Sequence, residues 1–284
     1  MSGYARPELL ATPEWLAENL DRPGFGVLDL RWRPDGSGRR LYATGHVPGA
    51  TYIDWRADLT EQEEASDILL LPGPQQLVET LARAGVGNGM VAVLYDDSGA
   101  GYAARVWWTL RAYGLESARI LVGGLEAWRD FGGPISTAVE LRPPIIFTPR
   151  LQPRSRLTAS EVKQLLGSAG VQLLDARPPA EFAGHSGGTR RLGHIPGALN
   201  VPAAATADPR SGAFLDSDEL RSLLRRAGVN ARGRLICYDW AGLGACKLAF
   251  ALTLIGFDDV AVYEGGWVEW GDRLDLPVET GHRD

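Results

Sequence analysis

Cysteine and histidine are scarce in this chain of 284 residues. The only two cysteines, Cys237 and Cys246, cannot build a disulfide framework, and so few thiols fit a reducing cytoplasm. Of the four histidines, His185 and His282 stand alone and the other two occupy matching turns, so we expect no metal-ligand cluster. The sequence therefore predicts a protein without a metal or another cofactor.

A basic excess and long apolar runs are also missing. Acidic residues outnumber basic ones by 35 to 29, and the resulting charge of −6 argues against a nucleic-acid partner. An apolar content of 45% with 23% charged residues is ordinary for a globular protein and argues against membrane insertion. The first residues lack the basic-then-apolar pattern of a signal peptide, so a cytoplasmic location is the default expectation.

What the chain has instead is an internal repeat. Four motifs occur twice in the same order: Gly45–Ala50 and Gly193–Ala198, Val27–Arg31 and Leu173–Arg177, Leu94–Asp96 and Cys237–Asp239, Leu121–Trp128 and Tyr263–Trp270. Each copy is too long for a solenoid unit and has the length of a domain. His46 and His194 recur at the same place in both copies, which favours a hydrogen-bonded turn role over a catalytic one.

The two copies are separated by a proline-rich segment. Residues 141–154 contain four prolines, which deny the segment regular secondary structure and make it a semi-rigid linker. We therefore predict an N-terminal domain over residues 1–140, a linker over 141–154 and a C-terminal domain over 155–284.

Within each copy, short apolar runs alternate with helical patterns. This alternation predicts an α/β fold, in which each domain has a central, mostly parallel sheet flanked by helices on both faces. The predicted strands are Gly26–Leu30, Met90–Leu94, Arg119–Val122, Val171–Leu174, Leu235–Tyr238 and Val260–Tyr263, and the predicted helices are Gln75–Ala84, Ala103–Tyr113, Asp218–Ala227 and Ala245–Ile255.

The stretch from Leu235 to Leu252 is the most informative part of the sequence. It predicts a buried strand, a tight loop over Asp239–Gly244 and a helix from Ala245. A short glycine-containing loop that leads into a helix directs several backbone N–H groups inward, where the helix dipole adds positive charge. The stretch therefore predicts a cradle for an anion at the carboxyl edge of the sheet.

This loop and its surroundings resemble the active-site loop of the rhodanese family, the thiosulfate and 3-mercaptopyruvate sulfurtransferases. In that family the loop typically has the sequence Cys-Gly-Ser-Gly-Val-Thr-Ala-Cys, and its first Cys carries the transferred sulfur as a persulfide. Here the sequence is Asp239-Trp-Ala-Gly-Leu-Gly-Ala-Cys246, so the loop length, the central Gly242 and the final Ala-Cys pair match. Asp239 stands at the position of the nucleophile.

The resemblance extends from about Val27 to Thr280 and covers nearly the whole chain. It implies two rhodanese-like domains, the first of the non-catalytic type that carries Asp where the second carries Cys. The first copy matches this pattern, since it has Asp96 at the loop start. The second copy also lacks the Cys and has Asp239 there. No cofactor is implied, and the implied substrate is a small sulfur-containing anion.

Asp239 admits two interpretations. We favour a fixture in which the ionised carboxylate permanently occupies the amide cradle; the alternative is an aspartyl nucleophile or general base, which nearby residues do not support. A thiol could substitute only from Cys237 or Cys246, and we expect both to be structural, although a helix N-terminus can activate an exposed thiol.

Other candidate residues surround this position. The remaining loop residues would form the substrate-binding loop: Trp240, Ala241, Gly242, Leu243 and Gly244. Trp240 is expected either to cap the cradle or to present an apolar surface to a partner. Arg177 is a candidate contact for a substrate anion, and a structural ion pair with Asp175 or Glu181 is an equal alternative.

Two functions follow from different classes. The resemblance implies a sulfurtransferase that moves sulfane sulfur from thiosulfate or 3-mercaptopyruvate to a thiophilic acceptor. The loss of the nucleophilic Cys favours a catalytically inactive tandem module that binds a protein or a small anion.

Overall fold

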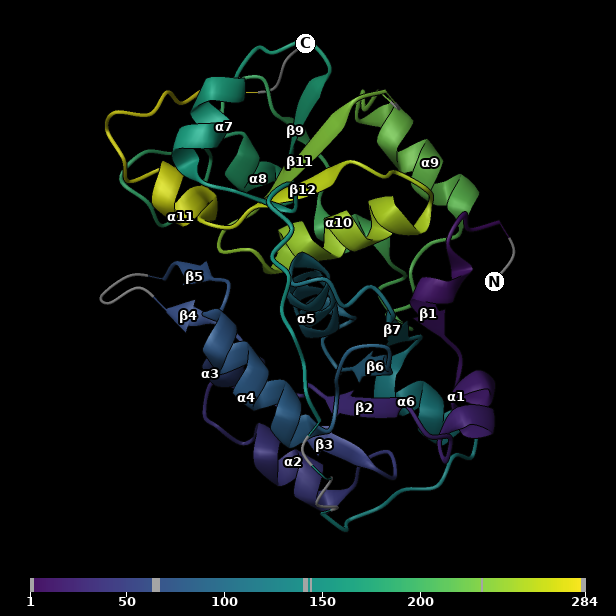
Figure 1. Ribbon diagram of the computed structural model, residues 1–284. Coiled ribbons are helices and arrows are strands. Elements are labelled where there is room, and N and C mark those ends of the chain that lie inside the picture. The colour runs from purple at the N-terminus through teal and green to yellow at the C-terminus, as the bar shows by residue number, and fades with distance from the viewer. Residues whose placement is uncertain (1–2, 63–66, 140–142, 144, 231, 282–284) are drawn as a thin grey trace.

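The computed structural model describes residues 3–62, 67–139, 143, 145–230 and 232–281. Its described residues form two five-stranded parallel sheets, each with helices on both faces (Figure 1). Within the described residues the strands of the two sheets follow the same spatial order, as expected for a duplicated domain. The predicted α/β architecture is confirmed.

The first sheet has the strand order β1-β7-β6-β2-β3. Its strands are β1 (Leu10–Ala11), β2 (Phe25–Asp29), β3 (Ala50–Tyr52), β6 (Val91–Tyr95) and β7 (Ala118–Leu121). The helices around it are α1 (Pro13–Asn19), α2 (Gly38–Thr44), α3 (Trp55–Asp58), α4 (Pro74–Ala84), α5 (Gly101–Ala112) and α6 (Gly124–Asp130), with a 3₁₀ turn over Pro7–Leu9. A small antiparallel hairpin, β4 (Glu61–Gln62) and β5 (Leu69–Leu70), projects from this domain.

The second sheet has the strand order β8-β12-β11-β9-β10. Its strands are β8 (Arg156–Leu157), β9 (Val171–Asp175), β10 (Leu199–Asn200), β11 (Arg234–Tyr238) and β12 (Val260–Tyr263). The helices are α7 (Ala159–Leu165), α8 (Pro179–Phe182), α9 (Ser217–Arg226), α10 (Leu243–Leu254) and α11 (Gly266–Trp270), with a 3₁₀ turn over Ala203–Thr206.

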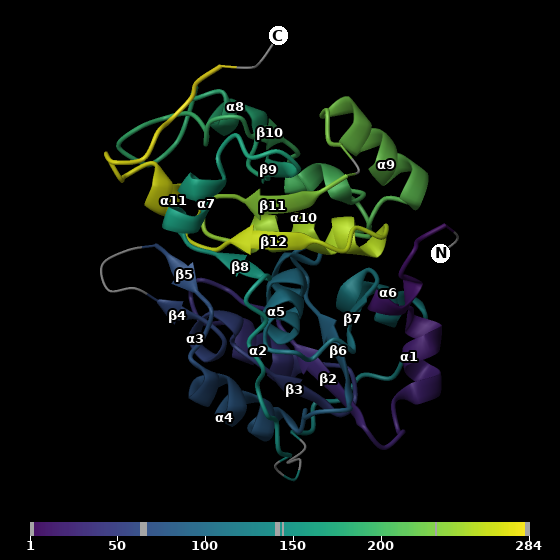
Figure 2. The same cartoon turned by 45° about the horizontal axis from the view of Figure 1, so that its top comes forward.

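Helices α5 and α10 pack against each other between the two sheets (Figure 2). Both are apolar on almost every side, as expected for helices that are buried by two domains. At their contact, the rings of Trp107 and Phe250 meet edge to face with centroids 4.8 Å apart. One buried apolar cluster runs through this contact and contains residues of both domains, so the halves share a core.

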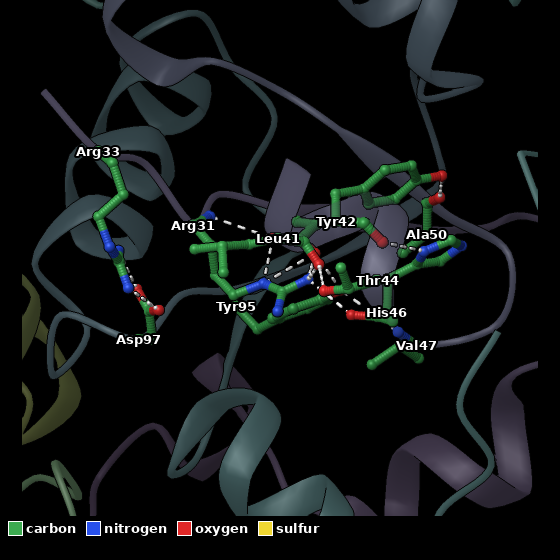
Figure 3. A network of polar contacts seen from close by, with 12 residues as sticks. Arg31, Arg33, Leu41, Tyr42, Thr44, His46, Val47, Ala50, Tyr95 and Asp97 are labelled. Atoms are coloured by element: carbon green, nitrogen blue, oxygen red, sulfur yellow. Dashed lines mark hydrogen bonds and ion pairs between the residues drawn. The ribbon is translucent and has the colours of Figure 1, made fainter. Parts of the chain in front are cut away.

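Matching polar networks hold the repeated turns. In the first domain Arg31 makes a double contact with the Asp29 carboxylate, which also accepts a hydrogen bond from the Tyr95 hydroxyl at 2.7 Å (Figure 3). The His46 ring stacks on Tyr42 in the same network, and its Nδ1 lies 2.8 Å from the Tyr42 carbonyl oxygen. The second domain repeats the arrangement with the His194 Nδ1 2.8 Å from a carbonyl oxygen, so both histidines are hydrogen-bonded turn residues.

The predicted linker lies partly outside the described residues. Its described residues, 143 and 145–154, form neither helix nor strand. They run along the first domain, where Phe147 is buried and the Thr148 amide donates to Asn88 Oδ1 at 2.6 Å. The exact domain bounds stay a prediction.

Candidate functional site

The loop after β11 is closed by its own first residue. The Asp239 carboxylate accepts a hydrogen bond from the Gly242 amide at 2.5 Å through Oδ1 and from the Gly244 amide at 2.7 Å through Oδ2. Gly242 has a φ of 101°, a left-handed conformation that favours glycine and turns these amides inward. The cradle predicted from the sequence is present, and the side chain of Asp239 fills it.

Burial dominates the electrostatics of this carboxylate. Only 8% of Asp239 is exposed, and burial raises its pKa above the ordinary value, although the Gly244, Gly242 and Ala245 amides act in the opposite direction. Amide donation to both oxygens is the arrangement that an ionised carboxylate accepts. The Asp239 carboxylate is therefore a satisfied acceptor, and it occupies the Gly242 and Gly244 amides of the loop.

The loop after β6 repeats the same device in the first domain. Asp96 Oδ1 accepts from the Ser98 and Ala100 amides at 2.9 and 3.0 Å, and Oδ2 accepts from the Ala103 amide at 2.7 Å. Burial raises the pKa of Asp96 as well. The two domains thus carry equivalent carboxylate-filled loops at the carboxyl ends of equivalent strands.

Neither cysteine is accessible near the loop. Cys237 in β11 and Cys246 in α10 are both free and completely buried. Burial raises the pKa of the Cys246 thiol to about 12, despite the nearby Arg105 guanidinium. The thiol of Cys246 is therefore neutral at physiological pH, and the helix N-terminus does not activate it.

Arg105 is the residue that the sequence analysis missed. It comes from α5 of the first domain, is 1% exposed, and a Cβ built on Gly242 would lie 2.6 Å from its Nη1. Its Nη2 donates to the carbonyl oxygens of Leu69 and Leu70 at 2.8 and 3.2 Å. Nε and Nη1 have no hydrogen-bond partner among the described residues, so the first domain places a buried positive charge against the loop of the second.

Arg177 does not join the loop. Its guanidinium contacts both Asp175 oxygens, donates to the Gly193 carbonyl at 2.7 Å and lies 4.4 Å from the Trp267 ring centre. This geometry favours the structural ion pair with Asp175 over the contact to a substrate anion. The equivalent pair of Arg31 and Asp29 in the first domain points to the same conclusion.

Several other residues of the loop make packing contacts. The Trp240 indole packs on Gly188, whose added Cβ would lie 2.9 Å from the ring, and it contributes to the apolar cluster of the second domain. Ala241 and Leu243 pack against the shared interdomain core. Gly244 has no room for a side chain, because an added Cβ would lie 2.9 Å from Asp239 Oδ2.

Comparison with known proteins agrees with the duplicated fold. The model of the rhodanese-like domain matches the chain twice, over residues 12–131 and 158–273. The chain belongs to the rhodanese family. Both matches include a carboxylate-filled loop, so each rhodanese-like domain of this protein has Asp at the start of its loop.

Relatives of this rhodanese are similar over nearly their whole length. SseB from Mycobacterium tuberculosis is 36% identical over 98% of this chain and 99% of that protein. The 3-mercaptopyruvate sulfurtransferase of Escherichia coli K12 is 35% identical over 94% of this chain and 96% of that protein. The crystal structure of SseA from Escherichia coli superposes with a TM-score of 0.81 at 29% identity, covering 91% of this chain and 98% of that one.

Two properties of the described residues bear on the expectations about membranes and metals. None of their helices has the length and apolarity needed to cross a membrane. Among the same residues, no three His, Cys, Asp or Glu side chains group closely enough to hold a metal ion.

Proposed function

We propose that this rhodanese is a non-catalytic tandem module that acts by binding and carries no sulfur. The observation that supports the proposal is the position of the Asp239 carboxylate, whose two oxygens take the Gly242 and Gly244 amides. The family resemblance places the sulfur-carrying Cys at this position. A carboxylate cannot attack sulfane sulfur to give a stable persulfide, because that step needs a thiolate.

The surroundings of the loop support the same proposal. A negative carboxylate in the cradle repels an arriving anion such as thiosulfate and takes the N–H groups that would otherwise hold it. Cys246 cannot act in place of Asp239 while it is fully buried and its pKa is raised to about 12. The bound partner in this proposal is a protein or a small anion. The proposed location of the protein is the cytoplasm.

A second candidate is sulfur transfer itself. Identity of 35% to a 3-mercaptopyruvate sulfurtransferase over 94% of this chain favours it. In that case the substrate is thiosulfate or 3-mercaptopyruvate, and Cys246 in the first turn of α10 would have to supply the thiol. The helix α10 would have to open to expose it, since the side chain has no access in the folded state.

A steady-state assay separates the two candidates. Purified protein is supplied with thiosulfate or 3-mercaptopyruvate and with cyanide as acceptor, beside the Escherichia coli 3-mercaptopyruvate sulfurtransferase as a positive control. Loss of a covalent nucleophile removes several orders of magnitude in rate, so we expect turnover at the uncatalysed background. Turnover close to the positive control, abolished by Cys246→Ser, would establish the sulfurtransferase instead.

A further inference from the structure

A cavity of about 660 Å³ lies between the two domains beside the Asp96 loop, and none of residues 239–244 lines it. One wall consists of residues 96–100 and the strand end at residues 120–124 of the first domain. The opposite wall is residues 207–214 of the second domain, with Lys247 of α10. Small-molecule sites typically enclose roughly 300–1,000 Å³, so the cavity has the size of a ligand site.

Lys247 is the counterpart of Arg105 in the duplicated fold. Each is the fifth residue of a twelve-residue helix, in α10 and α5 respectively, and each faces the carboxylate-filled loop of the other domain. A Cβ built on Gly99 would lie 3.8 Å from Lys247 Nζ, as Gly242 approaches Arg105 in the other loop. The positions of Arg105 and Lys247 are therefore equivalent in the two domains, and the cavity of about 660 Å³ lies at Lys247.

The two cations differ in what they contact within their own domain. Arg105 donates to the carbonyl oxygens of Leu69 and Leu70 in the hairpin. Lys247 instead lies 5.9 Å from the Phe214 ring centre. Its ammonium has no hydrogen bond and no ion pair with any residue in the described part of the chain. The nearby Asp96 carboxylate offsets only part of the cost of burying this ammonium, and a bound anion would relieve more of it.

The carboxylates in the cavity wall are mostly satisfied by other groups. Asp97 pairs with Arg33 through two contacts of 2.9 and 2.5 Å (Figure 3). Asp96 accepts three loop amides, and Asp208 accepts the Arg210 and Ser211 amides of its own turn at 2.9 Å each. Glu126 also lines the cavity and is exposed to solvent. Arg210 also lines the cavity, at an exposed position. Lys247 is thus the half-buried charged group of this wall that makes no hydrogen bond and no ion pair among the described residues.

Beside its polar groups, the cavity wall also contains apolar side chains. They include Phe214 from the second domain and Leu10, Ile120 and Leu121 from the first sheet. These four side chains are buried in the fold and 9% exposed at most. A ligand that fits this wall carries one acidic group and an apolar body.

We infer that this cavity binds a small organic anion, with its acidic group on the Lys247 ammonium and its apolar body against Phe214 and the strand ends. Burial lowers the pKa of Lys247, and the negative charge of the nearby Asp96 raises it in part. The two side chains do not form an ion pair. The site goes beyond the proposed function and is separate from the Asp239 loop. Its test measures occupancy without turnover, so it does not depend on whether the chain transfers sulfur.

The chain contains only two lysines, Lys163 and Lys247, so Lys163 can serve as the matched control for changes at Lys247. The probe is anilinonaphthalene sulfonate, an aromatic sulfonate whose fluorescence rises in apolar sites, with benzoate as a non-fluorescent competitor. Titrations compare the native protein with Lys247→Gln, Lys247→Arg and the control Lys163→Gln, in which an exposed lysine that donates to the Asp275 carbonyl is changed. Urea unfolding of each variant confirms that it is folded.

We expect one benzoate-competable site per chain, with affinity about tenfold weaker or worse in Lys247→Gln and unchanged in Lys163→Gln. Lys247→Arg should retain most of the affinity because the positive charge remains. Acetylation mapped by peptide mass spectrometry gives a second readout: saturating probe should slow the modification of Lys247 and leave Lys163 unaffected. Absence of competable binding, equal affinity in Lys247→Gln, or unprotected Lys247 would each overturn the inference.

Discussion

At the scale of single residues, Asp239 decides what the second loop can do. A carboxylate with an amide on each oxygen is a structural acceptor, and the same geometry at Asp96 shows that the protein uses this device twice. Because both positions are buried, each carboxylate matters for stability through the N–H groups it satisfies.

Asp239→Asn should therefore destabilise the fold. Asparagine keeps one acceptor oxygen, but its NH₂ group faces the second loop N–H, which is left without an acceptor. A buried donor that loses its partner costs about 1–3 kcal/mol, so the free energy of unfolding in urea should fall by that amount. Asp130→Asn is the control, because this side chain is exposed and makes no hydrogen bond among the described residues. It should change the free energy of unfolding little. Equal stability of Asp239→Asn and native protein would show that the loop amides do not depend on this side chain.

The sequence predicted the residues of this loop but not the charge beside it. Asp239, Gly242 and Cys246 are close in sequence, and a strand, a tight turn and a helix place them together by local geometry. Arg105 and Lys247 reach the loops only because α5 and α10 pack across the domain interface. That packing depends on the assembled core, which sequence periodicity does not specify.

At the scale of elements, the predicted bounds of the long strands and helices agree with the observed bounds to within about two residues at each end. Runs such as Val91–Tyr95 and Leu235–Cys237 are apolar because parallel strands are buried on both faces. The short edge strands β1, β8 and β10 have two residues each and carry too little pattern to recognise. The hairpin β4–β5 escaped prediction for the same reason.

Helix α9 offers a test of how its first turn is held. The Asp216 side chain accepts hydrogen bonds from the Asp218 and Glu219 amides. In return, the Asp216 amide donates to the Glu219 carboxylate at 3.1 Å. Asp216→Ala removes this capping box and should lower the free energy of unfolding by about 1 kcal/mol. Asp218→Ala, in the same turn but outside the box, should cost less. A larger loss in Asp218→Ala would mean that the helix dipole, and not the cap, dominates.

At the scale of the whole molecule, the two domains behave as one unit because they share a core. The buried cluster that contains Trp107 also contains Phe250 and Leu28, which come from different domains. Glu264 of the second domain adds a polar link to the first by accepting a hydrogen bond from the Leu71 amide at 2.8 Å. An ion pair of 2.7 Å with Arg156 of its own domain holds the Glu264 carboxylate. Truncating this interface should therefore affect the entire fold.

Phe250→Ala tests that coupling. Removal of a fully buried aromatic side chain typically costs about 3–5 kcal/mol through lost transfer free energy and a residual cavity. We expect one calorimetric unfolding transition in native protein and in the variant, with a clearly lower midpoint in the variant. Leu274→Ala, at a side chain 74% exposed, should leave the midpoint unchanged. Two separate transitions in native protein would mean that the domains unfold independently.

The central claim concerns the sulfur-carrying position, and intact-protein mass spectrometry tests it most directly. The folded protein is incubated with excess thiosulfate, or with 3-mercaptopyruvate, then freed of small molecules and weighed without reductant beside its Cys246→Ser variant. Because Asp239 fills the amide cradle and both cysteines are buried, the account predicts no mass increase of one sulfur atom in either protein. A stoichiometric gain of one sulfur atom that cyanide removes and Cys246→Ser abolishes would contradict it.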